Sequence, residues 1–264
     1  MNKLYIVSSG AGGVNYLTQE AIKAIKESKV IVSYTKYAQE LSELFFGKEV
    51  ITSGMTKEIE RCNIAINSAL NNRVTSIISN GDVNVFAMAS LIVELIDEKN
   101  LWDKIEVISI AGVSAIFATA SKVGAPISQD FAIISLSDRL TDINMIQKRL
   151  KNAIEADFVI GIYNPISKTR IKPYEILLKE LENANSKTPV IISSNIGRDS
   201  EKITIINIEK LINTGVKNKL LSMSTMLIIG NSSTQLTKNN LVLTTRGYLN
   251  KYDKSGELLN NRLN

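Results

Sequence analysis

The stretch "IISNGDVNVFAMA", residues 77–89, decides the fold of this chain. An apolar run typical of a buried strand ends at Asn80-Gly81-Asp82, and a segment with helical composition follows at once. In open α/β sheets, ligands bind beyond the carboxyl ends of the strands. An amide, a glycine and a carboxylate at such an end therefore predict a ligand site at this edge of the sheet.

The composition is typical of a soluble globular protein, since 44% of the 264 residues are hydrophobic and 22% are charged. No apolar run approaches the roughly 18 residues of a membrane span, and the short apolar N-terminal segment predicts a first strand rather than a signal peptide. The single cysteine, Cys62, excludes an internal disulfide and favours a cytoplasmic location. The net charge of +5 comes from scattered lysines, which favours an anionic small substrate over a nucleic acid.

The sequence contains no histidine. This excludes imidazole bases, serine or cysteine nucleophiles activated by histidine, and nearly all zinc sites, so no metal site is predicted. Catalysis must therefore rely on carboxylates, hydroxyls, lysines and backbone groups, or on a cofactor.

The first half of the chain alternates strands and helices. The apolar patterns predict strands at residues 3–9, 29–34, 73–79 and 105–110, and helices at 18–28, 56–72 and 85–99. Thr18 is the expected N-cap of the first helix. In helix 56–72 the residues available for burial are Ile59, Ile64, Ile66 and Leu70. Nearly continuous apolar strands joined by helices predict a mostly parallel sheet covered on both faces.

In the second half of the chain, the predicted strands are closer together and fewer helices separate them. Strands are predicted at residues 130–137, 157–164, 189–195, 202–208, 225–231 and 241–245, and helices at 144–156 and 174–184. Such spacing implies hairpins and hence a mixed sheet. The prediction is two α/β domains, residues 1–123 and 124–248, followed by a polar tail at 249–264.

Glycine-rich polar turns follow several of these strands. The first turn carries Gly10, Gly12 and Gly13, but Asn15 stands where a dinucleotide-binding loop needs glycine, and no acidic ribose ligand follows the second strand. This argues against a nicotinamide-binding fold. Further turns read "SNGD", "AGVSA", "YNPISKTR", "SSNIGRD" and "GNSST". We expect all of them at one sheet edge, lining an interdomain cleft for an extended ligand.

Four longer stretches carry a family resemblance: "VITSGM", "DFAIISLSD", "YNPISKTR" and "IIGNSST". From about residue 3 to residue 248, the chain resembles the tetrapyrrole methylase superfamily, and within it the precorrin-3B (cobalt-factor III) C17-methyltransferases of cobalamin biosynthesis. The resemblance implies S-adenosylmethionine as cofactor, an anionic tetrapyrrole substrate and a cytoplasmic homodimer. The implied reaction methylates carbon 17 of the macrocycle and contracts the ring.

The resemblance also implies roles for particular residues. Asp82 is the candidate catalytic residue. The implied cofactor-binding residues are Ala11, Asn80, Gly81, Asp82, Val85, Ser114, Ala115, Tyr163, Asn164, Gly197 and Thr225, the last four of them from the second domain. The implied substrate-binding residues are Tyr34, Ser135, Arg170 and Lys172. The general acid is left open among Asp82, Asp138, Ser135 and Tyr34.

The sequence departs from the family pattern in its cofactor turns. The family texts GxGPG, GDPGIYGMA and PGVTA read "SGAGG", "GDVNVFAMA" and "AGVSA" here. Asn84 is expected to keep its turn by adopting a left-handed conformation, whereas Phe86 and Ala87 could narrow the pocket or alter the substrate.

Several alternatives therefore stay open at this point. They are a sibling methylase acting at another ring position, a methylase of protein or RNA, and a non-catalytic protein that retains the fold. The sequence also does not distinguish a cobalt-containing from a metal-free substrate.

Overall fold

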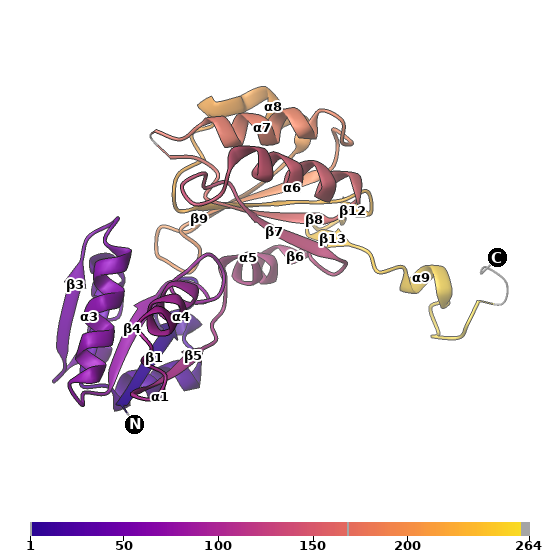
Figure 1. Cartoon of the computed structure of the whole chain (residues 1–264). Coiled ribbons are helices and arrows are strands. Elements are labelled where there is room, and N and C mark those ends of the chain that lie inside the picture. The colour runs from indigo at the N-terminus through magenta and orange to yellow at the C-terminus, as the bar shows by residue number, and fades with distance from the viewer. Residues whose placement is uncertain (1, 168, 260–264) are drawn as a thin grey trace. The chain divides into compact units, whose positions relative to one another are not determined.

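The computed structural model describes residues 2–167 and 169–259, which form two compact units (Figure 1). Unit 1 consists of Met1–Ala118 together with Asn195–Glu201, and unit 2 of Thr119–Ser194 together with Lys202–Asn264. The first division falls inside helix α5 (Ala115–Val123). A short segment from the second half of the sequence thus belongs to the first unit.

Unit 1 contains a five-stranded sheet in the order β3-β2-β4-β1-β5, in which all neighbours are parallel. The strands are β1 (Asn2–Ser8), β2 (Val30–Tyr34), β3 (Glu49–Ser53), β4 (Thr75–Ser79) and β5 (Ile105–Ile110). The predicted parallel sheet is confirmed. Strand β3 was not predicted, because it is an edge strand with mostly exposed or half-buried residues and lacks a continuous apolar run.

Helices cover both faces of this sheet. Alternation along β1 sends Leu4 and Ile6 to one face and Tyr5 and Val7 to the other. The first pair packs with α3 (Glu58–Leu70) and α4 (Ala89–Glu98), and the second with α1 (Gln19–Glu27), α2 (Thr35–Glu40) and η2 (Ser42–Phe45). A short helix, η1 (Val14–Tyr16), precedes α1. Thr18 caps α1 as predicted, since its Oγ1 accepts a hydrogen bond from Ala21 N at 3.1 Å.

The buried stripe of α3 differs in part from the prediction. Ile66 is fully buried and Ile64 and Leu70 pack against the core, but Ile59 is 61% exposed, so its predicted burial is wrong. The buried residues are Arg61, Cys62, Ala65, Ile66 and Ala69. The i, i+3, i+4, i+7 stripe therefore starts at Cys62, and its small residues let the helix approach the sheet closely.

Unit 2 contains a mixed sheet in the order β10-β9-β11-β8-β7. The strands are β7 (Phe131–Ser135), β8 (Val159–Tyr163), β9 (Pro189–Ser194), β10 (Lys202–Asn207) and β11 (Thr225–Ile229). β7 and β8 are parallel, β11 is antiparallel to both of its neighbours, and β10 is antiparallel to β9, so the predicted mixed sheet is confirmed.

Three helices pack together on one face of this sheet: α6 (Ile143–Glu155), α7 (Lys172–Leu181) and α8 (Ile208–Thr214) (Figure 1). A small third sheet joins β12 (Thr234–Leu236), β13 (Val242–Thr244) and β6 (Gly124–Ala125). The remaining elements are η3 (Gly215–Lys217) and α9 (Tyr248–Lys251).

The "GNSST" turn lies at the opposite edge of the sheet from the other turns of unit 2. Because β11 is antiparallel to its neighbours, its C-terminal end meets the start of β9, where Gly230 N donates to Pro189 O at 3.0 Å. The expectation that this turn shares the common edge is therefore wrong. Asn231 Nδ2 instead donates to Gln129 Oε1 and Asp157 O, both at 3.0 Å, which gives the turn a structural role.

Candidate functional site

The carboxyl ends of β1 and β4 form the ligand edge of unit 1. The helix after β1 and the helix after β4 cover opposite faces, so a switch point of the sheet lies between these neighbouring strands. Beyond the strand ends, Gly10 N donates to Gly81 O at 3.1 Å and Gly81 N donates to Gly10 O at 2.7 Å. Both glycines have φ of +72°, a conformation that favours glycine. The two turns are thus locked together.

The Ser8 hydroxyl joins a third turn to this pair. Its Oγ donates to Ile110 O at 2.6 Å and accepts from Val83 N at 2.9 Å. A Cβ on Gly112 would overlap the Ser8 side chain and lie 2.6 Å from Gly81 O. The turns after β1, β4 and β5 are therefore in close contact at one edge.

Asp82 anchors the same three-turn arrangement. Its Oδ1 accepts from Asn84 N at 2.8 Å, and its Oδ2 accepts from Gly112 N at 2.9 Å. The side chain thus holds its own turn and the turn after β5 with one charged group. Because Asp82 makes the turn with Asn84 N–H, Asn84 does not need a left-handed backbone, and the expectation that it adopts one is wrong. The positive φ falls at Phe86, at +54°.

The open side of Gly81, where a Cβ would be placed, is only loosely packed. Apart from its chain neighbours, the nearest atoms to a Cβ on Gly81 would be Ser114 Oγ at 3.9 Å and Ser114 Cα at 4.0 Å. Ser114 is buried and directly precedes α5, which begins at Ala115. Val85 is half-buried in the turn after β4. The structure therefore gathers the predicted cofactor residues of the first domain around one edge.

Gly197 belongs to unit 1, whereas the sequence reading assigned it to the second domain. A Cβ on Gly197 would lie 2.7 Å from the Tyr16 ring, and a Cβ on Gly12 would lie 2.9 Å from Ile196 O. The segment Asn195–Glu201 and the glycine turn after β1 thus approach each other backbone to backbone. Two glycines make this approach possible.

Arg198, in the same segment, was missed by the sequence reading. Its guanidinium donates to both carboxylate oxygens of Glu40, at 2.8 and 2.9 Å, to Ala11 O at 2.9 Å and to Asn80 Oδ1 at 2.9 Å. Only 17% of the Arg198 side chain and 22% of the Glu40 side chain are exposed. The only sequence signal was the position of Arg198 inside the "SSNIGRD" turn.

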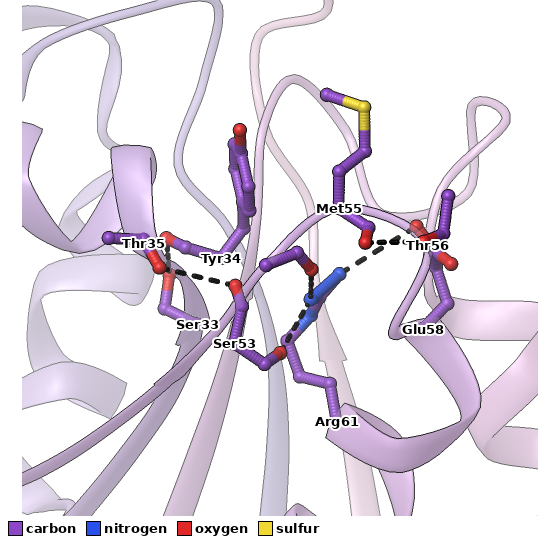
Figure 2. A network of polar contacts seen from close by, with 9 residues as sticks. Ser33, Tyr34, Thr35, Ser53, Met55, Thr56, Glu58 and Arg61 are labelled. Atoms are coloured by element: carbon purple, nitrogen blue, oxygen red, sulfur yellow. Dashed lines mark hydrogen bonds and ion pairs between the residues drawn. The ribbon is translucent and has the colours of Figure 1, made fainter.

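Tyr34 lies at the carboxyl end of β2, beside a buried arginine that the sequence reading also missed. Figure 2 shows Arg61 reaching from α3 to the turn after β3, where its Nη1 donates to Ser53 Oγ at 2.8 Å and to Gly54 O at 3.1 Å. The guanidinium carbon lies 6.0 Å from the centre of the Tyr34 ring, a cation–π distance. Arg61 therefore holds Ser53 and Gly54 of the "VITSGM" stretch and lies beside the Tyr34 ring.

Apart from Tyr34, the residues predicted to contact substrate lie in unit 2, in the segments that follow β7 and β8 or at the ends of these strands. Ser135 pairs with Tyr163 at the ends of β7 and β8. Asn164, with φ of +52°, donates from Nδ2 to Ser135 Oγ at 3.0 Å. The Asn164 carbonyl accepts from Arg170 Nη2 at 3.0 Å. Ser135, Asn164 and Arg170 thus form one connected cluster.

The guanidinium of Arg170 is only partly satisfied. Among the residues that the structure describes, its buried Nε has no hydrogen-bond partner. Burial lowers the pKa of Arg170, and the opposing effect of Asp138 is smaller. A desolvated cation with an unused donor is suited to an anionic ligand. Lys172 is the exposed first residue of α7.

Thr225 is buried at the start of β11, where its Oγ1 lies 2.7 Å from Ser194 Oγ and accepts from Ser222 N at 2.9 Å. Its hydroxyl is therefore engaged within unit 2.

Cys62, the single cysteine of the sequence, is buried. Burial raises the pKa of the Cys62 thiol to about 12, so this group does not supply a thiolate at neutral pH. Within residues 2–167 and 169–259, no cluster of three or more acidic or cysteine side chains is arranged to hold a metal ion. No helix in these ranges is long and apolar enough to cross a membrane.

Comparisons with known proteins agree with this arrangement. The profile of the Tetrapyrrole (Corrin/Porphyrin) Methylases matches residues 3–212. A probable cobalt-factor III C(17)-methyltransferase of Methanocaldococcus jannaschii is 38% identical over 94% of this chain and 99% of its own length. The cobalt-factor III methyltransferase of Priestia megaterium is 37% identical over 95% of this chain, which spans only 46% of that longer protein.

Solved structures show the same fold. The methyltransferase CobJ superposes with a TM-score of 0.85 at 26% identity, covering 93% of this chain and 100% of its own. A uroporphyrin-III C-methyltransferase of Thermus thermophilus, complexed with S-adenosylhomocysteine, gives a TM-score of 0.66 at 17% identity, covering 86% of this chain and 97% of its own. Since the family profile covers most of the sequence and relatives above 30% identity align along nearly all of it, the chain belongs to the tetrapyrrole methylase family.

Proposed function

We propose that this chain uses S-adenosylmethionine to methylate carbon 17 of a tetrapyrrole of the precorrin-3B or cobalt-factor III type, with ring contraction, in cobalamin biosynthesis. The observation that carries the proposal is the edge of unit 1, where three interlocked turns surround the open side of Gly81. The position of the methyl transfer rests on the names of the relatives.

The residues of this edge fit S-adenosylmethionine. Its amino-acid end carries an ammonium and a carboxylate, and the turn after β4 offers the Asp82 carboxylate and the Asn80 amide two residues apart. Ser114, across from Gly81, would contact the adenosyl side, and Ala11, Val85 and Ala115 are proposed as further contacts. A Cβ at Gly81 would occupy the space that the cofactor needs.

The chemistry fits a chain without histidine. When bound, the cofactor supplies an electrophilic methyl group, and an electron-rich ring carbon is the nucleophile. The residues of the chain therefore have to bind, orient and exclude water rather than act as a base that titrates near neutrality. Asp82, which holds two backbone N–H groups, is proposed as an anchor of the cofactor ammonium.

Changing Asp82 to Asn tests this anchoring role. The variant loses the charge that pairs with the ammonium and replaces one of two acceptors of backbone N–H groups with a donor. The dissociation constant for S-adenosylmethionine should rise about tenfold or more, while kcat at saturating cofactor stays within about tenfold of wild type, equivalent to 1.4 kcal/mol. Steady-state kinetics and calorimetry measure the two effects.

Asp142→Asn is the matched control, because Asp142 accepts from Asn144 N at 2.8 Å in the same local pattern at the start of α6. It should leave cofactor affinity unchanged. A kcat that collapses by several orders of magnitude in Asp82→Asn with normal cofactor binding would instead make Asp82 an acid–base catalyst.

Arg170 is proposed to hold a carboxylate arm of the substrate, with Lys172, Ser135 and Tyr34 as further contacts. Arg170→Ala removes a desolvated cation with an unused donor. The substrate KM should rise by roughly 10- to 100-fold, about 1.5–3 kcal/mol, with cofactor affinity unchanged. Arg149→Ala, an exposed arginine on α6, is the control. An unchanged substrate KM in Arg170→Ala would show that Arg170 does not bind the substrate and has only a structural role within unit 2.

Tyr163, Asn164, Gly197 and Thr225 remain proposed cofactor contacts, and the homodimer and the cytoplasmic location remain parts of the same proposal. Analytical ultracentrifugation over a range of concentrations tests the dimer. A monomer at micromolar concentration would contradict it.

The activity itself is tested by supplying S-adenosylmethionine with a ¹³C-labelled methyl group and following the product by mass spectrometry and NMR. We expect one labelled methyl on carbon 17 of a ring-contracted product. Parallel reactions with cobalt-loaded and metal-free precursors identify the substrate form. Labelling at another ring position would favour a sibling activity, and cofactor binding without any transfer would favour a non-catalytic role.

A further inference from the structure

The Asn80 side chain has only one possible orientation, and Arg198 sets it. A guanidinium only donates hydrogen bonds, so the Asn80 atom 2.9 Å from Arg198 Nη2 must be the acceptor Oδ1. The Asn80 Nδ2 group therefore lies on the other side of the amide. Among the described residues, the hydrogen bond recorded for the Asn80 side chain is this one, through Oδ1, and the residue is half-buried.

Arg198 is itself held firmly in place. Glu40 receives two hydrogen bonds from it in a forked arrangement, and the carbonyl of Ala11 receives a third. This geometry needs the planar guanidinium, because a lysine ammonium cannot satisfy these acceptors at once. The carboxylate of Glu40 also balances the charge of Arg198. Arg198 therefore affects Asn80 through a directed hydrogen bond rather than through an uncompensated positive charge.

Several other groups of the turn after β4 are engaged within the protein, although the Asp82 carboxylate keeps further lone pairs. Gly81 N is bonded to Gly10 O, and Asp82 accepts two backbone N–H groups. Asn80 Nδ2 is thus a side-chain donor in the residue next to Gly81, and Arg198 holds the opposite end of its amide. An α-amino acid group carries its cation and its anion on one carbon. A carboxylate at residue 82 and an amide donor at residue 80 match such a pair.

From these contacts we propose that Arg198 is a positioning residue that orients the Asn80 amide, so that Nδ2 donates to the carboxylate of the amino-acid end of S-adenosylmethionine. The inference rests on the proposed function. It assigns Asn80 as a specificity determinant for ligands that carry this carboxylate, and it explains why a segment from the second half of the sequence is part of unit 1.

The test replaces Asn80 with Asp, which has nearly the same shape and keeps an acceptor for Arg198 but turns the Nδ2 donor into a negatively charged acceptor. Calorimetry is done with S-adenosylhomocysteine, which has the amino-acid end, and with 5′-methylthioadenosine, which lacks it. We expect the S-adenosylhomocysteine dissociation constant to rise about 30-fold or more and that for 5′-methylthioadenosine to change by less than about twofold. The thermal midpoint should not fall, because the new carboxylate pairs with Arg198.

Two further variants sharpen the result. Asn72→Asp adds the same charge at an exposed turn of unit 1 and should leave both affinities unchanged. Arg198→Met removes the orienting contact and should weaken S-adenosylhomocysteine more than 5′-methylthioadenosine.

Equal losses for both ligands, or no loss for either, in Asn80→Asp would overturn the inference while leaving the proposed function intact. If the wild-type protein binds neither ligand, the inference fails together with the proposed function.

Discussion

Replacing Gly112 with Ala is expected to cause a large loss of stability, because Gly112 is tightly packed at the ligand edge of unit 1. The new Cβ would overlap the Ser8 side chain and lie 2.6 Å from Gly81 O, so backbone and a buried hydroxyl would have to move. Ser8 connects Ile110 O to Val83 N, and Gly112 N holds Asp82. Overpacking of this kind costs about 3 kcal/mol, to which broken hydrogen bonds add.

The measurement is the thermal midpoint of unfolding, which should fall by roughly 6–12 °C for a cost of about 3 kcal/mol. Gly54→Ala is the matched control, since no atom lies within 4 Å of its Cβ position and its φ is not in the left-handed region. The control should leave the midpoint unchanged or slightly raised. Equal midpoints for the two variants would show that the three turns are not tightly packed.

Replacing Gly81 with Ala is expected to have the largest effect on cofactor binding. Only Ser114 lies near the Cβ position, at 3.9 Å, so the methyl group enters the space reserved for the ligand without a clash inside the protein. The affinity for S-adenosylhomocysteine should fall about 100-fold, equivalent to roughly 2.7 kcal/mol.

In Gly81→Ala, the loss of stability caused by backbone strain must be separated from the loss of ligand affinity. Gly81 has φ of +72°, so any side chain there is strained by about 1–2 kcal/mol. Gly47 has φ of +74° with no atom within 4 Å of its Cβ position, and Gly47→Ala therefore carries the same strain without touching the site. Both variants should lose similar stability, but only Gly81→Ala should lose affinity. Equal affinities of the two variants for S-adenosylhomocysteine would show that Gly81 is not part of the cofactor site.

The sequence was sufficient to predict the class of fold and much of the ligand edge of unit 1. Buried parallel strands have nearly continuous apolar runs, and their ends are followed by recognisable glycine turns, as at Gly10, Gly81 and Gly112. Thr18 was predictable because capping is a local property. Strand β3 was not, since an edge strand of "EVITS" composition has no clear apolar pattern.

Local sequence patterns could not predict the direction of each strand in unit 2. They also could not predict contacts between residues far apart in the sequence. "GNSST" resembles the other turns, but the antiparallel direction of β11 places it at the opposite edge of the sheet. The contacts of Arg198 with Glu40 and Asn80 join residues 158 and 118 positions apart. Nothing in the local composition around Arg198 predicts these partners, and a solvated charge is the usual expectation for an arginine in a polar turn.

The central claim is that the three interlocked turns of unit 1 bind the cofactor, and hydrogen exchange measured by mass spectrometry tests it most directly. Backbone amides are compared in the presence and absence of saturating S-adenosylhomocysteine. We predict that exchange slows in the peptides that cover residues 8–13, 79–86 and 110–115, and in the segment Asn195–Glu201, which Arg198 connects to them. Tight binding of S-adenosylhomocysteine with unchanged exchange in these peptides, and protection elsewhere, would contradict the account.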